Sequence, residues 1–599
     1  MSTHGGQVRL YETLCRVLDS LRGEAPKSNT IYNPPPGNAD AVIQARSRAL
    51  LHLFLKARFG LIRFDEREAY VTDGSNDGGI DAFYVDAKSK IIYVLQSKFR
   101  ATSGNFVTKN MSPSDLLKMD VSRVLKGEKR QESGVAYNDR IRNGLQKAIR
   151  KLTDPGSYTT QVVLLGNIKD LSDNQFKRLV EGYRVDQYPH NRIYMELLFP
   201  VITGTYFTDP NLTIEINLAN LRGETHLDYD ARALGMKPNV KLLFVPTREI
   251  GRIMLTYKNT ILKFNPRSYL ELQHNKVNRA IEASVRQTDE NEFALFNNGI
   301  TIIADSTSIS SDTARQGTAQ VVLRNPQLVN GGQTAYTLAR IFESCRRPKD
   351  FDVFKGKEVL LRVITFAGPV KPAGLSARLN LIGEISKASN FQTKVDESDR
   401  RANDPIQVHL QAEFFDEYGL YYERKRGEFS DGLHYGYLPP DLLIGRERLV
   451  RVSLACDFRA SQARSNIKKF FTETELPKVL KISDVSKYTF GYEVLKALDR
   501  KKRSKPKKPG DRYHVREFGQ ALRYGQYAVI AVCANHGMPS GMSEADAVDT
   551  ALAQWRSFER WAKKLPANRS YRQGNSFSFV NYYKGSTVNA DLRRFKFRF

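Results

Sequence analysis

Two groups of residues in the segment Gly74–Arg100 have side chains suited to metal-assisted hydrolysis. Asp77 and Asp81 lie on either side of a Gly-Gly pair, and the apolar run Ile91–Leu95 is followed directly by Gln96-Ser97-Lys98. Residues two apart on a strand point to the same face, so Gln96 and Lys98 can lie beside Asp81 on a neighbouring strand. Carboxylate and carbonyl oxygens suit a hard cation, and a lysine can orient a water. This pattern is typical of phosphodiester hydrolysis.

The elements around these residues predict an α/β domain that closes near residue 205. A helix is expected from Asp40 to Phe59, ended by Gly60, and a further helix from Asp139 to Leu152. Strands are expected at Ala69–Thr72, Ile80–Val85, Ile91–Leu95 and Thr160–Leu165, with another helix near Asn174–Tyr183. The order helix, three strands, helix, strand favours a sheet with its strands packed against helices.

The segments Gly78-Gly79-Ile80-Asp81 and Gln96-Ser97-Lys98 resemble the PD-(D/E)XK nuclease superfamily, in particular its Mrr-like branch. The resemblance covers roughly residues 39–205 and implies a restriction-endonuclease-like αβββαβ domain. It implies catalytic roles for Asp81, Gln96 and Lys98. It also implies that Mg²⁺ or Mn²⁺ is held by Asp81, Gln96, the Ser97 carbonyl and Asp77.

Two features depart from that family pattern. Gln96 stands where an acid is commoner, and the acid that many relatives carry on the first helix has no match, because Asp40 lies at the wrong end and Glu66 and Glu68 follow the helix. The alternative is that the aspartates are turn residues and that Gln96 and Lys98 only decorate a strand end.

The middle of the chain predicts a mixed α+β domain. Glu292–Asp305 contains two apolar runs about Asn-Gly, which predicts a hairpin. Ala319–Phe342 predicts strand, turn, short strand, Gly-Gly and helix. Asp404 is expected to cap a helix that begins at Pro405 and stops at Gly419.

Four segments in this part, Phe296–Thr301, Val329–Thr334, Ser389–Val395 and Tyr421–Phe429, resemble the AIPR family, named for abortive-infection phage resistance. Their amide side chains suit hydrogen-bonded recognition better than catalysis. A helix beginning at the Gly-Gly pair can receive an anion, and the arginines beside Tyr421 and Tyr422 can bind a nucleic-acid backbone or stack a base. Tight turns, close packing and a solvated charged face are the competing interpretations. The candidate ligand or nucleic-acid binding residues are Asn297, Asn298, Asn330, Gly331, Gly332, Gln333, Asn390, Gln392, Arg424, Lys425 and Arg426.

Composition limits the classes of function. The 599 residues carry a net charge of +27, which indicates a polyanionic partner, most simply nucleic acid. Four widely spaced cysteines favour neither zinc nor disulfides and suit a reducing cytoplasm. No export signal or membrane-spanning run is seen, so we expect a cytoplasmic protein without membrane association.

The sequence as a whole predicts an α/β multidomain protein. We expect a helical extension (1–38), the nuclease-like domain (39–205), the AIPR domain (206–498), a basic linker (499–513) and a C-terminal α+β region (514–599) of two helices and a final hairpin. The expected function is that of an antiviral-defence, Mg²⁺-dependent endonuclease controlled by a sensing domain. Double-stranded DNA is favoured over RNA as substrate, and the trigger would be a phage-derived molecule or a nucleotide. A homo-oligomer is compatible with this scheme. The alternative is a nucleic-acid-binding or regulatory protein whose nuclease-like domain is degenerate and does not cut.

The basic tract generates a first prediction. Gln replacements in this tract should weaken duplex binding and lower the slope of log affinity against log salt by roughly 0.9 for each phosphate that is no longer neutralised. The measurement is a salt titration of DNA binding, and an unaltered slope would mean that the tract is only a spacer. The residues to replace are Lys501, Lys502, Arg503, Lys505, Lys507 and Lys508.

Overall fold

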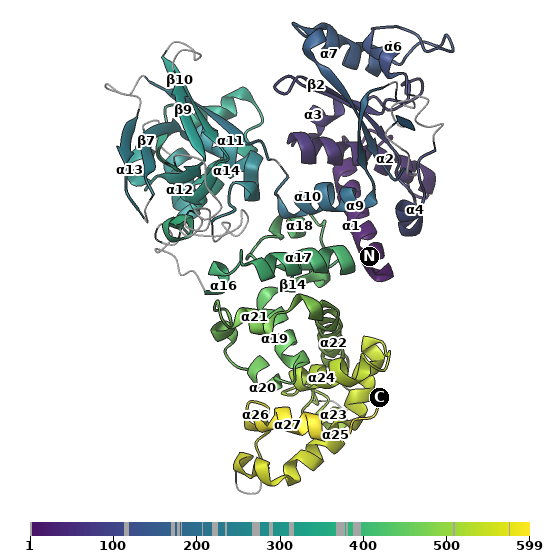
Figure 1. Ribbon diagram of the computed structural model, residues 1–599, viewed down its shortest axis with the longest axis vertical. Helices are drawn as coiled ribbons and strands as arrows, with labels where there is room; N and C mark the ends of the chain where they lie inside the picture. Colours follow the sequence, from purple (N-terminus) through teal and green to yellow (C-terminus); the bar gives the residue numbers. More distant parts are fainter. Residues whose placement is uncertain are drawn as a thin grey trace. The chain divides into compact units, whose positions relative to one another are not determined.

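The structure is a computed structural model of the 599-residue chain, drawn in Figure 1 with its elements labelled. It describes residues 3–112, 119–168, 174–175, 180, 182–206, 208–218, 226–233, 236–265, 276–286, 291–310, 317–366, 378, 381–386, 388, 397–506, 510–573 and 576–599. The chain divides into two compact units, each described separately below. One comprises Gln7–Lys394 and Arg426–Pro440, and the other comprises Met1–Gly6, Val395–Lys425 and Asp441–Phe599.

A four-stranded mixed sheet organises the N-terminal part of the first unit. Its strand order is β1-β2-β3-β4, with β1 and β2 antiparallel and β2, β3 and β4 parallel to one another. The strands are β1 (Ala82–Asp86), β2 (Ile91–Ser97), β3 (Thr159–Leu165) and β4 (Arg184–Tyr188). The helices of this part are α1 (His4–Gly23), α2 (Ala39–Phe59), α3 (Phe64–Glu68), α4 (Ser103–Thr108), α6 (Val121–Leu125), η1 (Ile141–Leu145), α7 (Gln146–Arg150), α9 (His190–Arg192), η3 (Ile193–Leu198) and α10 (Phe199–Thr203).

Most of the predicted elements of this part are present. Helix α2 ends as expected at Gly60, whose φ of 68° lets its N–H reach the Lys56 carbonyl at 3.1 Å. The predicted strand Ala69–Thr72 is wrong, because this segment contributes only an isolated antiparallel bridge between Val71 and Ala82. Strand β4 was missed. The helix expected near Asn174–Tyr183 lies largely outside the described residues.

Two further sheets and the helices α11 and α14 build the second core of this unit. A five-stranded sheet has the order β11-β8-β12-β7-β6, and a three-stranded antiparallel sheet has the order β5-β10-β9. The strands are β5 (Asn211–Asn217), β6 (Leu227–Asp230), β7 (Pro238–Pro246), β8 (Ile300–Ala304), β9 (Ser306–Ser310), β10 (Thr318–Arg324), β11 (Gln327–Asn330) and β12 (Glu358–Phe366). The helices are α11 (Thr247–Tyr257), α12 (Lys276–Arg286), α13 (Phe293–Phe296) and α14 (Gly332–Ser344), and α18 (Ser430–His434) belongs to the same unit.

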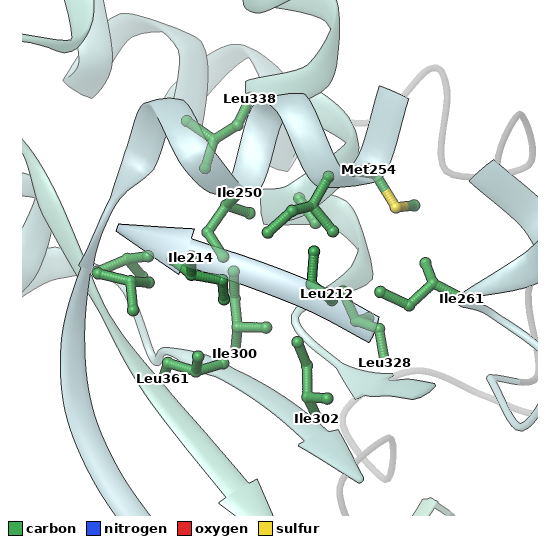
Figure 2. Packing of buried hydrophobic residues seen from close by; sticks show 14 of the residues in the cluster. Leu212, Ile214, Ile250, Met254, Ile261, Ile300, Ile302, Leu328, Leu338 and Leu361 are labelled. Atoms are coloured by element: carbon green, nitrogen blue, oxygen red, sulfur yellow. The ribbon is translucent and has the colours of Figure 1, made fainter. Parts of the chain in front are cut away.

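The apolar face of β5 lies in the middle of this core. Figure 2 shows Leu212 and Ile214 between the helix residues Ile250, Met254 and Leu338 and residues of the larger sheet. On β5 the buried residues alternate with exposed ones, as a strand with one covered face requires. The helices are therefore fastened to both sheets by one continuous apolar cluster.

The hairpin predicted at Asn297-Asn298-Gly299 is wrong. Phe293–Phe296 is the short helix α13, and Asn297 ends it by accepting the N–H of Gly299 at 3.0 Å. Strand β8 then pairs with β11 and β12. Gly299 has the left-handed backbone that its residue type allows, with φ 80°, but the apolar run before Asn297 is helical. The strand, turn, strand and helix expected over Ala319–Phe342 are confirmed as β10, β11 and α14.

The second unit is largely helical. Helix α17 (Pro405–Tyr418) begins and ends where predicted, with Gly419 in the left-handed region at φ 60°, although the Asp404 side chain does not cap it. A short parallel ladder joins β13 (Tyr421–Glu423) to β14 (Leu443–Gly445). The remaining α-helices among the described residues are α16 (Glu397–Arg400), α19 (Arg446–Cys456), α20 (Ala460–Ala463), α21 (Leu476–Val479), α22 (Val485–Arg503), α23 (Val515–Phe518), α24 (Gln526–Val532), α25 (Glu544–Lys564), α26 (Phe579–Tyr582) and α27 (Thr587–Arg594).

Three sequence expectations for this unit need correction. Asp499–Arg503 belongs to α22, so the basic tract begins as helix and not as linker. The helix expected over Val515–Ala534 is interrupted after α23 at Gly519, where φ is 61° and any side chain would meet the Glu559 carboxylate. The final hairpin consists only of β15 (Arg572–Gln573) and β16 (Ser576–Phe577), and two helices follow it. Helix α25 confirms the expected second helix, with Ser543 as its N-cap. Within the described residues, no helix has the length and apolar character needed to cross a membrane.

Two glycines with nearly equal positive φ give a matched test of packing. Gly331 has φ 80°, and a Cβ there would lie 2.8 Å from Ile300 Cγ1 and 2.9 Å from the Gly299 carbonyl oxygen. Gly317 has φ 81° with open space around it. We expect Gly317→Ala to cost about 1–2 kcal/mol of stability from backbone strain. Gly331→Ala should cost about 1–3 kcal/mol more because of the clash. Denaturant unfolding of the two variants measures the difference, and equal losses would contradict the packing described for Gly331.

Candidate active site

Asp81 is held at the start of β1 by hydrogen bonds on both sides of its backbone. Its N–H donates to the Leu95 carbonyl at 2.8 Å, and its own carbonyl accepts from the N–H groups of Thr72 and Asp73 at 2.8 and 2.9 Å. The carboxylate accepts the Ser97 N–H at 2.7 Å. The segment before β1 and the end of β2 therefore meet at this one residue.

Three carboxylates converge at this point. Asp73, Asp77 and Asp81 each offer an oxygen, and these oxygens all lie within 4.8 Å of one another. Asp77 and Asp81 were expected from the sequence, but Asp73 was missed. The regular spacing of four residues in Asp73–Asp81 was the signal available. In a loop, a spacing of four residues does not by itself bring side chains together. Asp73 is placed beside Asp81 because its N–H donates to the Asp81 carbonyl.

Each flanking aspartate also has a structural partner. The Arg48 Nε of α2 forms an ion pair with Asp73, and its Nη2 donates to the Asp73 carbonyl at 3.3 Å. The two oxygens of Asp77 accept the N–H groups of Gly74 at 3.0 Å and Gly79 at 2.9 Å. Asp77 thus has the hydrogen bonds of a turn residue, in line with the alternative interpretation of the sequence.

The Gly-Gly pair is required by the turn itself. Gly78 and Gly79 have φ values of 66° and 70°, in the left-handed region. A Cβ on Gly78 would lie 2.7 Å from the ring of Tyr137. Close packing therefore explains Gly78 without a bound phosphate.

The charge state of the cluster follows from its surroundings. Burial raises the pKa of Asp81 well above its usual range, and the nearby carboxylates of Asp73 and Asp77 raise it further, against the Ser97 N–H and the Lys98 charge. Burial also raises the pKa of Asp77. Repulsion among these carboxylates disfavours their charged forms in the free protein. A bound cation would reduce that repulsion.

The triplet at the end of β2 lies beside this cluster. Gln96 and Ser97 are buried, whereas Lys98 is exposed. The backbone of Lys98 is fixed by its N–H, which donates to the Leu165 carbonyl at 2.9 Å. The Ser97 Oγ is buried and has no hydrogen-bond partner among the described residues. The triplet thus reaches Asp81 through the Ser97 N–H and through the charge of Lys98.

Helix α2, the first helix of the predicted nuclease domain, contributes no acid to the cluster. Helix α2 brings Arg48 to Asp73, while its His52 contacts Glu68 at 3.2 Å. Glu68 at the end of α3 also accepts from Tyr32 and pairs with Arg140 at 2.9 Å. Glu68 therefore belongs to a separate buried network and is not one of the three clustered acids.

The structure brings two of the AIPR-like segments together. The Asn297 Nδ2 donates to Thr334 Oγ1 at 3.0 Å, and Asn330 pairs with Thr301 across β11 and β8. Helix α14 begins at Gly332, as the sequence predicts, and the Asn330 Oδ1 accepts the Gly331 N–H at 2.8 Å. The exposed Asn298 and the partly buried Gln333 flank this contact. Asn390 and Gln392 lie outside the described residues.

The fourth segment differs from its predicted use. Tyr421 and Tyr422, which flank the predicted binding run Arg424–Arg426, are completely buried and present no ring to a ligand. Arg424 donates to Gln411 Oε1 at 2.9 Å, the Ala402 carbonyl at 3.0 Å and Asn403 Oδ1 at 2.8 Å, and Lys425 is buried. Arg426 is exposed. Arg424 therefore holds its own unit together, and nucleic-acid binding by this run stays a prediction.

Comparison with known protein families finds a match, which covers the middle of the chain. Residues 262–520 match the family model described as AIPR protein. This match identifies an AIPR domain and supports the resemblance found in the sequence motifs. No curated protein and no solved structure matches the chain.

The raised pKa of Asp81 predicts a metal-dependent stability profile. Below about pH 3.9, the ordinary Asp value, the carboxyl is protonated in both the folded and unfolded states. At higher pH the unfolded chain releases the proton first, so folding stability falls until the pH passes the pKa of folded Asp81. Asp81→Asn should therefore raise the melting temperature at neutral pH without metal. Mg²⁺ should stabilise the wild type increasingly as the pH rises, by about 1.4 kcal/mol at ten times its Kd.

Asp86→Asn at the end of β1 is the matched control, because Asp86 lies outside the three-carboxylate cluster. Melting curves from pH 5 to 8, with Mg²⁺ or EDTA, make the comparison. An equal Mg²⁺ response in the wild type and Asp81→Asn would contradict a metal site at this cluster.

Proposed function

We propose that residues 39–205 form a divalent-metal-dependent nuclease domain and that the AIPR domain controls it in defence against phage. The observation that carries the proposal is the convergence of Asp73, Asp77 and Asp81 beside Lys98. The sheet supports it too, since an antiparallel pair is followed by a strand parallel to the second, with α2 packed on β2. In this proposal, the isolated Val71–Ala82 bridge would stand in place of the first strand of the αβββαβ order, which is not formed as a strand here.

The residues present fit a hard cation. Mg²⁺ and Mn²⁺ prefer carboxylate and carbonyl oxygens, which this cluster supplies in a partly buried place. Asp81 and Asp73 would hold the ion, with Asp77, Gln96 and the Ser97 carbonyl as further oxygen donors. A bound cation would supply Lewis-acid stabilisation of a phosphate oxygen and a more acidic water.

The protein's own residues have separate tasks in this scheme. Lys98 is exposed at the strand end, and its positive charge acts to lower the pKa of Asp81. It would orient the attacking water or stabilise the negative charge that develops on the phosphate. Arg48 fixes Asp73 against α2 and so positions one carboxylate. The net charge of +27 favours a nucleic-acid substrate, and duplex DNA is the form we propose.

A second candidate function is nucleic-acid binding without cleavage. The hydrogen bonds of Asp77 to Gly74 and Gly79, together with the Arg48–Asp73 ion pair, favour it, because both aspartates have partners without a metal. Under this alternative the AIPR domain would regulate binding alone.

Cleavage assays separate the two functions. With plasmid, linear DNA and RNA as substrates, Mg²⁺ or Mn²⁺ should support cleavage and EDTA should abolish it. Asp81→Asn should remove activity by weakening metal binding. Lys98→Met should lower it at least about 100-fold, as expected for loss of a proton-transfer or charge-stabilising group, while metal-linked stabilisation is retained.

Lys109→Met is the control for Lys98→Met, since Lys109 is also exposed and follows α4. It removes the same charge and should leave cleavage unchanged. Full cleavage by folded Asp81→Asn and Lys98→Met would reject the assigned site. Absence of cleavage by the wild type in every metal, with intact DNA binding, would favour the non-cleaving alternative.

A further inference from the structure

Three arginines and two tyrosines line a pocket in the helical unit, apart from the AIPR-like motifs. The pocket has a volume of about 210 Å³ and is lined by Arg451, Arg464, Arg523, Tyr524, Gln526 and Tyr527. These residues come from α19, the C-cap of α20, the segment before α24 and the first residues of α24. Arg523 and the lining residues that follow it lie beyond residue 520, where the match to the AIPR family model ends.

The guanidinium groups contact backbone carbonyls and aromatic rings, which carry no net charge. Arg451 Nη1 donates to the Ala463 carbonyl and to the Ser465 carbonyl, the latter at 3.3 Å, and Arg464 Nη1 donates to the Tyr524 carbonyl. Arg523 lies over the ring of Tyr524 at 4.8 Å and faces Tyr513 at 5.6 Å. Within the described part of the chain, none of these three arginines forms an ion pair with a carboxylate.

This arrangement concentrates unbalanced positive charge. Asp499 of α22, an acid whose charge acts on the pocket residue Tyr527, pairs with Arg448 at 3.4 Å. The Arg464 guanidinium is partly removed from water, and this burial lowers its pKa. Converging cations without a counter-charge repel one another, and an anion in the pocket would remove that cost.

The other residues that line the pocket indicate which class of anion it binds. Gln526 Nε2 is buried and has no hydrogen-bond partner among the described residues, so it offers one further donor. Guanidinium groups bind phosphate in a planar, two-pronged manner, and a phosphate monoester carries about −1.5 to −2 charges with three terminal oxygens. Tyrosine rings can stack on a nucleobase.

We propose that this pocket binds the terminal phosphate of a nucleotide, either free or at the end of a nucleic-acid strand. Arg451, Arg464 and Arg523 neutralise the phosphate, Gln526 donates to one of its oxygens, and Tyr524 or Tyr527 contacts the adjoining sugar or base. A water in the liquid occupies about 30 Å³. The pocket volume of about 210 Å³ is several times larger, so the pocket has room for a phosphate group, with the rest of the nucleotide towards its mouth.

The test measures binding to the full-length protein in EDTA, which suppresses metal-dependent cleavage. The probes are inorganic phosphate, adenosine monophosphate, and one single-stranded oligonucleotide with either a 5′-phosphate or a 5′-hydroxyl. We expect Arg464→Met and Arg523→Gln each to weaken phosphate-dependent binding about tenfold or more, the effect of losing a charge-assisted hydrogen bond. Arg560→Gln is the matched control, since Arg560 is exposed on α25, has no ion pair among the described residues and does not line the pocket.

The outcomes distinguish the sources of the phosphate. Binding of adenosine monophosphate without a preference for the 5′-phosphorylated strand assigns the pocket to a free nucleotide. Tighter binding of the 5′-phosphorylated strand, lost in Arg523→Gln and kept in Arg560→Gln, assigns it to a strand end. The proposal is overturned if no probe binds, or if all three variants bind each probe as the wild type does. If Arg464→Met does not fold, Arg523→Gln decides alone, because Arg523 is exposed, whereas Arg464 holds the Tyr524 carbonyl.

Discussion

The candidate active site depends on the backbone hydrogen bonds of Asp81, which connect two segments of the chain. Its N–H is bonded to β2 and its carbonyl to the segment Thr72–Asp73, so two stretches of chain are fixed against each other. The same residue presents its carboxylate to the Ser97 N–H. Backbone hydrogen bonds thus bring like charges together, although the carboxylates alone would repel one another. Burial and the neighbouring carboxylates make the charged form of Asp81 less favourable, and its pKa is therefore raised.

The parts of the fold that could be predicted from the sequence are those set by local chemistry. Gly60 and Gly419 end α2 and α17 because their backbones adopt the left-handed region, and the apolar run before Gln96 forms β2. The start of α14 after the Gly-Gly pair was predicted from the apolar residues at helical spacing that follow it, Ala335, Leu338, Ala339 and Phe342. Local preference and final structure agree at these places, as expected where tertiary contacts do not override propensity.

The features that could not be predicted depend on contacts between distant residues. Asp73 joins the cluster through the Asp81 backbone and Arg48, and the tyrosines of the fourth AIPR-like segment are buried by packing that no short motif encodes. The alternation of basic and aromatic residues over Tyr421–Arg426 indicated an exposed binding surface, which this packing contradicts for the two tyrosines. The arginine pocket was also missed, since Arg451, Arg464 and Arg523 are too far apart in sequence to form a recognisable pattern.

One buried ion pair joins parts of the first unit that are made at different times. Lys258 Nζ bonds to Asp431 at 2.7 Å, both side chains are almost fully buried, and 173 residues separate them. A ribosome adding 5–20 residues per second takes roughly 10–35 s to make that interval. During synthesis, Lys258 emerges long before its counter-ion, and its charge cannot be buried without cost until Asp431 arrives. Residues 395–425 of the second unit are translated between Lys258 and Asp431. The buried ion pair of the first unit therefore forms only after this part of the second unit has been synthesised.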